Sequence, residues 1–303
     1  MGLIAGVLLF LLWQSPNWRG GSLDIDPVLH GAGVLLRGED PYLESWRWVT
    51  REWPWPLAYP MPAVLIAVPF ALLPFDVARA AFMGTSVAVL AFALTRAGWW
   101  PLILLLSGPA VQAFASGQWS PLLTGAALVP GLGWLLAAKP NLGLALLLGS
   151  PTLERAWRTV TLILAALAVA TVVAPGWWGA YVVAIGPVTH VPMVSRPFGF
   201  VLLLAALRWR HPVARILLGL LFIPQSTTFY EALPLGLVAE SRREVLLFAT
   251  VSLGAFALWF SQPWPEGYPA HIAFGWPYVL GGVYLPVLAM LLLRRPRPEA
   301  PAN

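Results

Sequence analysis

The stretch Leu23-Asp24-Ile25-Asp26-Pro27, with its continuation to Gly38-Glu39-Asp40-Pro41-Tyr42, is the most polar part of a strongly apolar chain. Hydrophobic residues make up 59% of the sequence and charged residues only 10%. The segment 15–58 nevertheless holds six of the 13 acidic residues: Asp24, Asp26, Glu39, Asp40, Glu44 and Glu52. Carboxylates gathered directly after a first hydrophobic segment need a chemical or structural reason, so this stretch is the first candidate for a functional site.

The composition around this stretch indicates an all-α integral membrane protein. Soluble domains carry about 25% charged residues, whereas this chain has 10% and a mean hydropathy of +0.75. Its apolar runs are continuous rather than alternating, which favours helices over a barrel. We expect residues 1–303 to form a single polytopic domain of roughly eight to twelve spans, several of them short or broken, at about 20 residues each.

The net charge of +5 comes from arginines, since Lys139 is the only lysine. The arginines lie between hydrophobic segments, as the positive-inside rule predicts, so we do not expect nucleic-acid binding. The tail 294–303 is basic and should be cytoplasmic. Cysteine is absent, which excludes disulfides and thiol chemistry. The preference for arginine over lysine is typical of a GC-rich bacterial genome, and we expect a multi-pass protein of the bacterial inner membrane.

The acidic segment has its own predicted helices. Apolar spacing predicts a helix over Pro27–Arg37, with Asp26 as its N-cap and Gly38 as its C-terminal stop. Asp40 reads as a turn or cap residue before a second amphipathic helix over Tyr42–Trp53, which would lie at the membrane interface. Segments 15–58 and 176–196 are expected to be extracytoplasmic loops.

The middle of the chain is interrupted at membrane depth. Breaks fall at Gly108-Pro109, between Pro130 and Gly133, and at Lys139-Pro140. Irregular backbone inside a membrane protein is tolerated only where protein or a cavity covers it, so we expect a cavity here. At the start, Met1–Trp13 is apolar but short, and we interpret it as a retained first span.

Several motifs resemble glycosyltransferase family 87, a family of GT-C membrane enzymes. The likeness lies in four short elements of the first half of the chain: Asp24-Ile25-Asp26 through Gly38-Glu39-Asp40-Pro41-Tyr42, Tyr59-Pro60-Met61-Pro62, Gly117-Gln118-Trp119, and Ala137-Ala138-Lys139-Pro140. This resemblance implies a GT-C-like helical bundle. It also implies transfer of a hexose, with mannose favoured, from a polyprenyl-phosphate sugar to a lipid or polysaccharide hydroxyl, with inversion, in cell-envelope glycan synthesis.

Two other classes of protein remain open. A secondary transporter would also have broken helices, although such proteins often contain inverted repeats and none is evident here. A catalytically degenerate GT-C-like protein is the second alternative. For the enzyme, the expected partners are the lipid bilayer, the polyprenyl-phosphate donor and the acceptor. No cofactor is expected, and a divalent metal is not favoured because too few oxygen ligands lie near the two aspartates.

Asp24 is the strongest catalytic candidate, and Asp26 is the second. A phosphate leaving group is stable as an anion, but the attacking hydroxyl needs a base. Asp24 has no evident structural role other than that of a solvated loop acid, whereas helix capping would account for Asp26. The substrate-binding candidates are polar residues in apolar or loop contexts: Gln118, Lys139, His190, Arg196, Tyr230, Glu231 and His271. Their structural alternatives are helix–helix contacts for Gln118, Tyr230 and Glu231, and snorkelling for Lys139.

Overall fold

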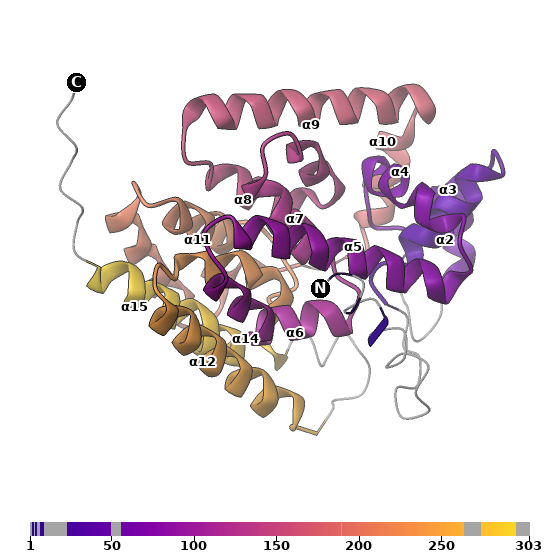
Figure 1. The fold of residues 1–303 in the computed structure, drawn as a ribbon. Helices are drawn as coiled ribbons and strands as arrows, with labels where there is room; N and C mark the ends of the chain where they lie inside the picture. Colours follow the sequence, from indigo (N-terminus) through magenta and orange to yellow (C-terminus); the bar gives the residue numbers. More distant parts are fainter. Residues whose placement is uncertain are drawn as a thin grey trace.

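The computed structural model describes Gly2, Ile4, Val7, Leu8 and the ranges 23–49, 56–188, 190–263 and 274–294. The fold is all-helical, with 76% helix and no strand within these ranges (Figure 1). One isolated antiparallel bridge joins Val191 and Gln225. The helical class predicted from composition is therefore confirmed, and the structure is consistent with a helical membrane protein.

The acidic segment folds as two short helices around a glycine turn. Helix α2 spans Asp26–Leu36, within a residue of the prediction. The helix ends at Gly38, whose φ is +76°. The Gly38 N–H donates to the Leu35 carbonyl, and the Glu39 N–H donates to the Val34 carbonyl, as is common at helix C-termini. Helix α3 spans Pro41–Ser45, and Asp40 caps it by accepting from the N–H groups of Tyr42 and Leu43.

The second helix of this segment is shorter than predicted. After α3 the chain tightens into the 3-10 turn η1, Trp46–Trp48, and the remainder of the predicted range Tyr42–Trp53 lies mostly outside the described residues. Leu43 and Trp46 are exposed. Such apolar side chains on a short surface helix suit a membrane interface.

Four helices are long and apolar enough to cross a membrane. They are α5 (Phe75–Thr95), α9 (Leu153–Val173), α12 (Arg242–Phe260) and the continuous run Trp276–Leu293. That last run consists of α14 (Trp276–Val279), the π-helical turn Leu280–Tyr284 and α15 (Leu285–Leu293). At about 1.5 Å per residue they reach roughly 27–31 Å, close to the hydrocarbon thickness. We expected eight to twelve spans, several of them short or broken. Within the described residues four helices have the full length, and the other apolar segments fold as shorter helices.

The shorter elements fill the space between the long helices. They comprise α4 (Met61–Ala71), η2 (Trp100–Leu106), α6 (Gly108–Ala115), α7 (Ser120–Leu128), η3 (Gly133–Ala138), α8 (Pro140–Leu148), η5 (Gly199–Arg208), α11 (Pro212–Phe222) and η6 (Phe229–Val238). The predicted interruptions at Gly108-Pro109 and Lys139-Pro140 coincide with the boundaries between η2 and α6 and between η3 and α8.

The segment 176–196 is not simply a loop. It contains helix α10, Trp177–Ile185, and the short 3-10 turn η4, Met193–Ser195. The segment was expected to be a loop between spans, and its extracytoplasmic location stays a prediction. Trp177, at the start of α10, is buried and stacks on Trp178, and the indole N–H groups of both donate to Thr171 of α9.

Glycines allow the inner helices to approach closely. A Cβ on Gly125 of α7 would lie 2.8 Å from the Leu90 nitrogen of α5. A Cβ on Gly108 of α6 would lie 2.3 Å from the backbone carbonyl oxygen of Ser252 in α12. The Ser252 hydroxyl accepts a hydrogen bond from the Gly108 N–H. Small residues at helix contacts are typical of packing inside membranes.

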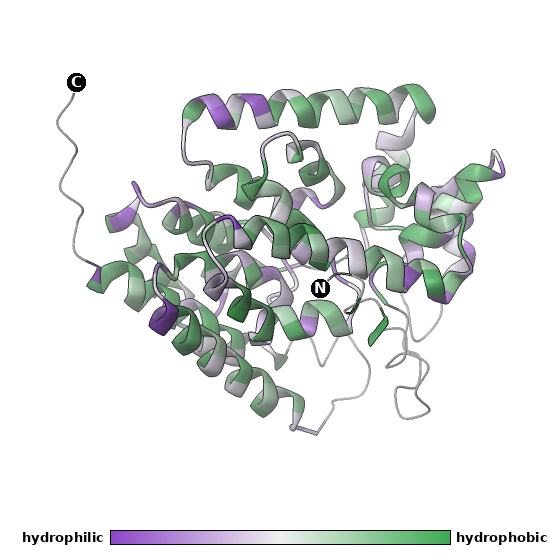
Figure 2. Cartoon of the chain, in the orientation of Figure 1, coloured by the Kyte–Doolittle hydropathy of each residue, from purple (hydrophilic) through white to green (hydrophobic). Residues whose placement is uncertain are grey.

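Helices α9 and α12 expose most of their apolar residues on the outside of the protein. Only 6% of the most apolar window of α9 is buried, and Figure 2 shows this helix as mainly hydrophobic with hydrophilic residues at the end where it begins. The start of α12 is hydrophilic in the same way. An exposed apolar helix with one polar end is typical of contact with lipid.

Candidate active site

A cavity of about 290 Å³ lies where α8, α10 and the start of η6 meet the acidic segment. Among its lining residues are Asp24, Lys139, Tyr181, His190 and Tyr230. Four of these were predicted as site residues from the sequence, and they come from separate parts of the chain. The tertiary structure thus brings the acid of the first loop to the single lysine.

Asp24 occupies the turn directly before α2, and its backbone is fixed there. Its N–H donates to the Ser116 carbonyl at 3.1 Å. Gly117, at φ +66°, lies against both neighbours of Asp24: a Cβ at this glycine would be 3.0 Å from the Leu23 Cβ and 3.2 Å from the Ile25 Cγ2. The chain reversal after α6 therefore determines where the Asp24 carboxylate points.

The two oxygens of the Asp24 carboxylate have different environments. Oδ2 accepts from the Gln118 side-chain amide and, at 3.4 Å, from the Tyr59 hydroxyl. Within the described residues no hydrogen bond reaches Oδ1. Because the residue also lines the cavity, one carboxylate oxygen is held and the other is available to a ligand.

Burial is the main influence on the proton affinity of Asp24. It raises the pKa of this carboxyl above its ordinary value of 3.8, although the positive charge of Lys139 and the Gln118 hydrogen bond act in the opposite direction. The negative charge of Glu231 adds to the increase. A carboxylate with a raised pKa is a better base near neutral pH than an exposed one.

Lys139 connects the two acids of the site. Its ammonium lies 3.3 Å from Gln118 Oε1 and donates to it, and it forms a 3.5 Å ion pair with Glu231. It also lies 4.7 Å from the centre of the Tyr230 ring, within the range of a cation–π contact. Asp24, Gln118, Lys139 and Glu231 therefore form one continuous polar chain inside an apolar protein.

Three residues that sequence reasoning did not assign to the site complete this chain. Asn141 donates to Glu231 at 3.2 Å, and the Ser226 N–H donates to the other oxygen of Glu231 at 3.0 Å. Tyr59 contacts Asp24, as described above. Tyr59 is the first residue of one quoted motif and Asn141 directly follows another, so the motifs could have identified them. Ser226 had only the weaker signal of a polar run between apolar segments.

The two predicted histidines and Arg196 have three different outcomes. His190 lines the cavity, and burial lowers the pKa of its imidazole below 6.5, which keeps the ring neutral near pH 7. His271 lies outside the described residues. Arg196 is not among the residues that line the cavity; its Nε is buried and has no hydrogen-bond partner within the described part of the chain.

Asp26 has a different structural role from the one predicted. The N-cap of α2 is Ile25, and no side chain caps this helix, so the capping prediction was wrong. Asp26 instead accepts from Arg79 of α5 at 2.7 Å and 2.5 Å, one bond to each carboxylate oxygen, and from the Leu23 N–H at 2.7 Å. This nearly buried ion pair fixes the start of α2 to α5. Asp26 is not among the residues that line the cavity.

No family model, curated protein or solved structure matches this chain. Within the described residues, no group of three or more His, Asp or Glu side chains is placed to hold a metal ion. The fold is thus all-helical, has four candidate membrane-spanning helices and encloses a polar site, which is consistent with a helical membrane protein.

Proposed function

We propose that the protein is a membrane glycosyltransferase that transfers a hexose, with mannose favoured, from a polyprenyl-phosphate sugar to a hydroxyl of a lipid or glycan. One observation carries the proposal: the motifs that resemble glycosyltransferase family 87 converge in space. Asp24, Gln118 and Lys139 are linked side chain to side chain, although the first pair is 94 positions apart in the sequence.

Asp24 is the base in the proposed reaction. The acceptor oxygen attacks the anomeric carbon as its proton passes to Oδ1 of Asp24, the oxygen that faces no protein donor in the described residues. The bond from the anomeric carbon to the phosphate oxygen breaks, and its electron pair leaves with the phosphate. A single displacement inverts the configuration, and the polyprenyl phosphate needs no acid because it leaves as a stable anion.

Lys139 is the proposed partner of the donor phosphate. Its ammonium is already shared between Gln118 and Glu231, so a phosphate would replace part of this network. Helix α8 begins at Pro140 beside it, and the N-terminus of a helix adds a partial positive charge. A cavity of about 290 Å³ is near the lower limit of small-ligand sites; it suits one sugar phosphate, with the polyprenyl tail lying outside among the apolar helices.

The arginines indicate the side of the membrane on which this reaction takes place. Most arginines of the described residues lie at the end of the molecule away from Asp24, where α5 ends and α9 and α12 begin: Arg96, Arg155, Arg158, Arg208, Arg210, Arg215, Arg242, Arg243 and Arg294. Positive charge marks the cytoplasmic side. The Asp24 cavity is then extracytoplasmic, in the cell membrane.

The test is transfer from labelled polyprenyl-phosphate mannose by membranes that contain the protein, with Asp24→Asn as the variant. Asp76→Asn is the matched control, because Asp76 is half-exposed on α5, pairs with Arg79 and does not line the cavity. We expect transfer to fall by about 10²–10⁴-fold in Asp24→Asn, the range for a lost general base, and to change less than twofold in the control.

Each result of this test has a definite meaning. Undiminished transfer in Asp24→Asn would remove Asp24 from the mechanism. Donor binding without transfer by the native protein, across many acceptors, would instead indicate a degenerate enzyme. Movement of intact donor across sealed vesicles without hydrolysis or transfer would indicate a transporter.

A further inference from the structure

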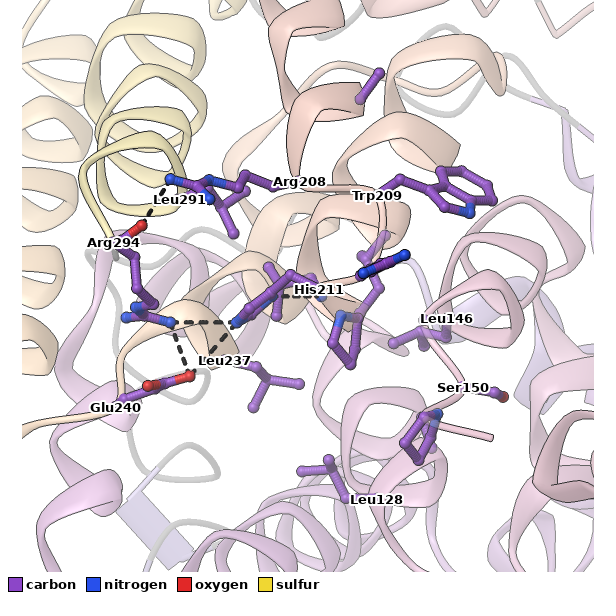
Figure 3. A pocket seen from close by; sticks show the side chains of 18 of the residues that line it. Leu128, Leu146, Ser150, Arg208, Trp209, His211, Leu237, Glu240, Leu291 and Arg294 are labelled. Carbon is purple, nitrogen blue, oxygen red and sulfur yellow. Dashed lines mark hydrogen bonds and ion pairs between the residues drawn. The ribbon is translucent and has the colours of Figure 1, made fainter. Parts of the chain in front are cut away.

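A second and larger cavity, of about 1030 Å³, lies at the arginine-rich end of the molecule. Its wall includes the first turn of α9, the end of η5, the start of α11 and the end of α15. Figure 3 shows Arg208, Trp209, His211 and Arg294 around this space, with Leu128 and Leu146 on other parts of the wall. None of its lining residues belongs to the Asp24 cavity.

Two of the lining arginines have no acidic partner among the described residues. Arg155 donates from Nη2 to the Ala127 carbonyl at 2.7 Å. Arg208 donates from Nη2 to the carbonyls of Leu292 and Arg294 at 2.9 Å and 2.7 Å. A guanidinium has five N–H donors, so each keeps donors on Nε and Nη1 that no protein group in the described ranges accepts.

Two further arginines, Arg210 and Arg294, line the cavity, and Arg294 is neutralised by acids. It pairs with Glu240 at 2.9 Å and with Glu244 at 3.0 Å, and it contacts the His211 ring at 3.2 Å. Figure 3 shows this cluster on one wall, with Arg208 donating to the backbone of Arg294. Of the acids at this end, Glu240 and Glu244 pair with Arg294 and Glu154 pairs with Arg158. No acid of the described residues pairs with Arg155 or Arg208.

Most of the other residues that line the cavity are apolar, and some of them are exposed on the outer surface. Leu207 is 74% exposed and Trp209 is 54% exposed, and both line the cavity beside Arg208. Leu128, Leu146 and Leu291 line three different sides of the space (Figure 3). Tryptophan beside arginine at the end of membrane helices is typical of the headgroup level of a bilayer. A water-soluble anion would not require this apolar surface, whereas an amphiphile would cover it.

We propose that this cavity binds an anionic phospholipid of the leaflet opposite the Asp24 cavity. Arg155 and Arg208 bind its phosphodiester, because guanidinium groups match phosphate oxygens in charge and geometry. The acyl chains lie along Leu207 and Trp209. Basic pockets between membrane helices bind acidic headgroups in this way. The site is independent of the glycosyltransferase reaction, and the purified protein binds this lipid without donor or acceptor.

The experiment measures binding of phosphatidylglycerol to the purified full-length protein in neutral detergent by native mass spectrometry. Phosphatidylcholine and sn-glycerol 3-phosphate are the comparison probes. We expect phosphatidylglycerol to bind at least tenfold more tightly than either. The double variant Arg155→Gln/Arg208→Gln should lose roughly tenfold or more of this affinity, since each basic residue near an anionic lipid contributes about 1 kcal/mol.

The matched control removes the same charge beside the cavity. Arg158 lies one turn further along α9 and is exposed in a pair with Glu154, and Arg243 is exposed near the start of α12. The double variant Arg158→Gln/Arg243→Gln should bind phosphatidylglycerol within twofold of the native protein. An equal loss in both double variants would show a diffuse charge effect and overturn the site. Equally tight binding of sn-glycerol 3-phosphate would show a soluble-anion site and overturn the lipid.

A second variant tests the site if the arginine variant does not fold. Leu207→Glu places a carboxylate on the exposed rim, where the native side chain makes little packing contact. It should weaken phosphatidylglycerol binding while leaving the melting temperature unchanged in lipid-free detergent. Unchanged affinity in this variant would contradict the proposed path of the acyl chains.

Discussion

The carboxylate of Asp24 accepts a hydrogen bond from the side-chain amide of Gln118, 94 positions further along the chain. The same amide group accepts from Lys139 through its oxygen. Gln118 therefore holds the acid and the cation of the site at a fixed separation, so that neither neutralises the other by direct contact. This arrangement leaves one face of each group toward the cavity.

Asp24→Asn and Asp26→Asn should change stability in opposite directions. Burial raises the pKa of Asp24 in the folded protein, so its ionised form opposes folding at neutral pH, and the neutral amide should leave the free energy of unfolding unchanged or higher. Asp26→Asn breaks the nearly buried pair with Arg79 and should cost about 3 kcal/mol. Unfolding of both variants in detergent at pH 7 measures the difference.

The pH series provides the control for that comparison. Because the folded pKa of Asp24 is raised, its unfavourable contribution grows as the pH rises and vanishes below the unfolded value near 3.8. The gap in stability between the native protein and Asp24→Asn should therefore close as the pH falls. A gap that widens at low pH would contradict the burial of this carboxyl.

Transfer activity should rise with pH through the ionisation of Asp24. The base must be deprotonated, so the rate falls as the pH drops through a pKa that lies above 3.8. Glu231→Gln removes a negative charge that raises this pKa, so the inflection should move to lower pH. Lys139→Met removes a positive charge that lowers it, so the inflection should move to higher pH. Shifts in the same direction for both variants would be inconsistent with this electrostatic arrangement.

The Lys139–Glu231 pair should show strong coupling in stability. The two side chains are 11% and 2% exposed, so removing one leaves the other charge buried, at a cost of about 3 kcal/mol. The double variant Lys139→Met/Glu231→Gln should be more stable than the sum of the single variants predicts, by at least about 1 kcal/mol. Arg37→Gln, which breaks the exposed pair with Glu39, should cost less than about 1 kcal/mol. Additive costs in the buried pair would refute the coupling.

Gly117→Ala should disturb the site, whereas Gly131→Ala should cost only backbone strain. Both glycines have positive φ, at +66° and +88°. A Cβ at Gly117 presses on Leu23 and Ile25, the neighbours of Asp24, whereas a Cβ at Gly131 meets nothing within 4 Å. The free energy of unfolding should fall by about 1 kcal/mol in each variant, because alanine is strained at positive φ. Transfer activity should fall clearly only in Gly117→Ala. Equal activity in the two variants would show that Gly117 does not position Asp24.

Local signals predicted the helical class and several boundaries correctly. Gly38 ends α2 and Asp40 caps α3, because backbone conformation and side-chain capping depend on residues next to one another. The interruptions at Gly108-Pro109 and Lys139-Pro140 were also predicted correctly from the local sequence. The number of spans stays a prediction, because an apolar segment of about ten residues has the same composition whether it crosses a bilayer or packs as a short inner helix.

The site could be predicted only as a set of candidates. Asp24, Lys139, His190 and Tyr230 were identified by the rarity of polar residues in an apolar chain, and the fold brings them to one cavity. Asp26 was wrongly predicted to cap α2. Its partner Arg79 is 53 positions away in the sequence, so no local pattern could predict this ion pair. Arg155 and Arg208 were read only as charges between spans.

By itself, the sequence determined that this chain is helical and membrane-like, because apolar composition and continuous hydrophobic runs leave few other ways to satisfy the backbone. The sequence also identified the polar residues that lie within apolar segments. Only the tertiary structure decided which of these residues contact one another or line the same cavity. Asp24 and Asp26 are two positions apart, yet one faces a cavity and the other is held by Arg79. Ile25, the N-cap of α2, separates them, and contacts made by distant helices give them different environments.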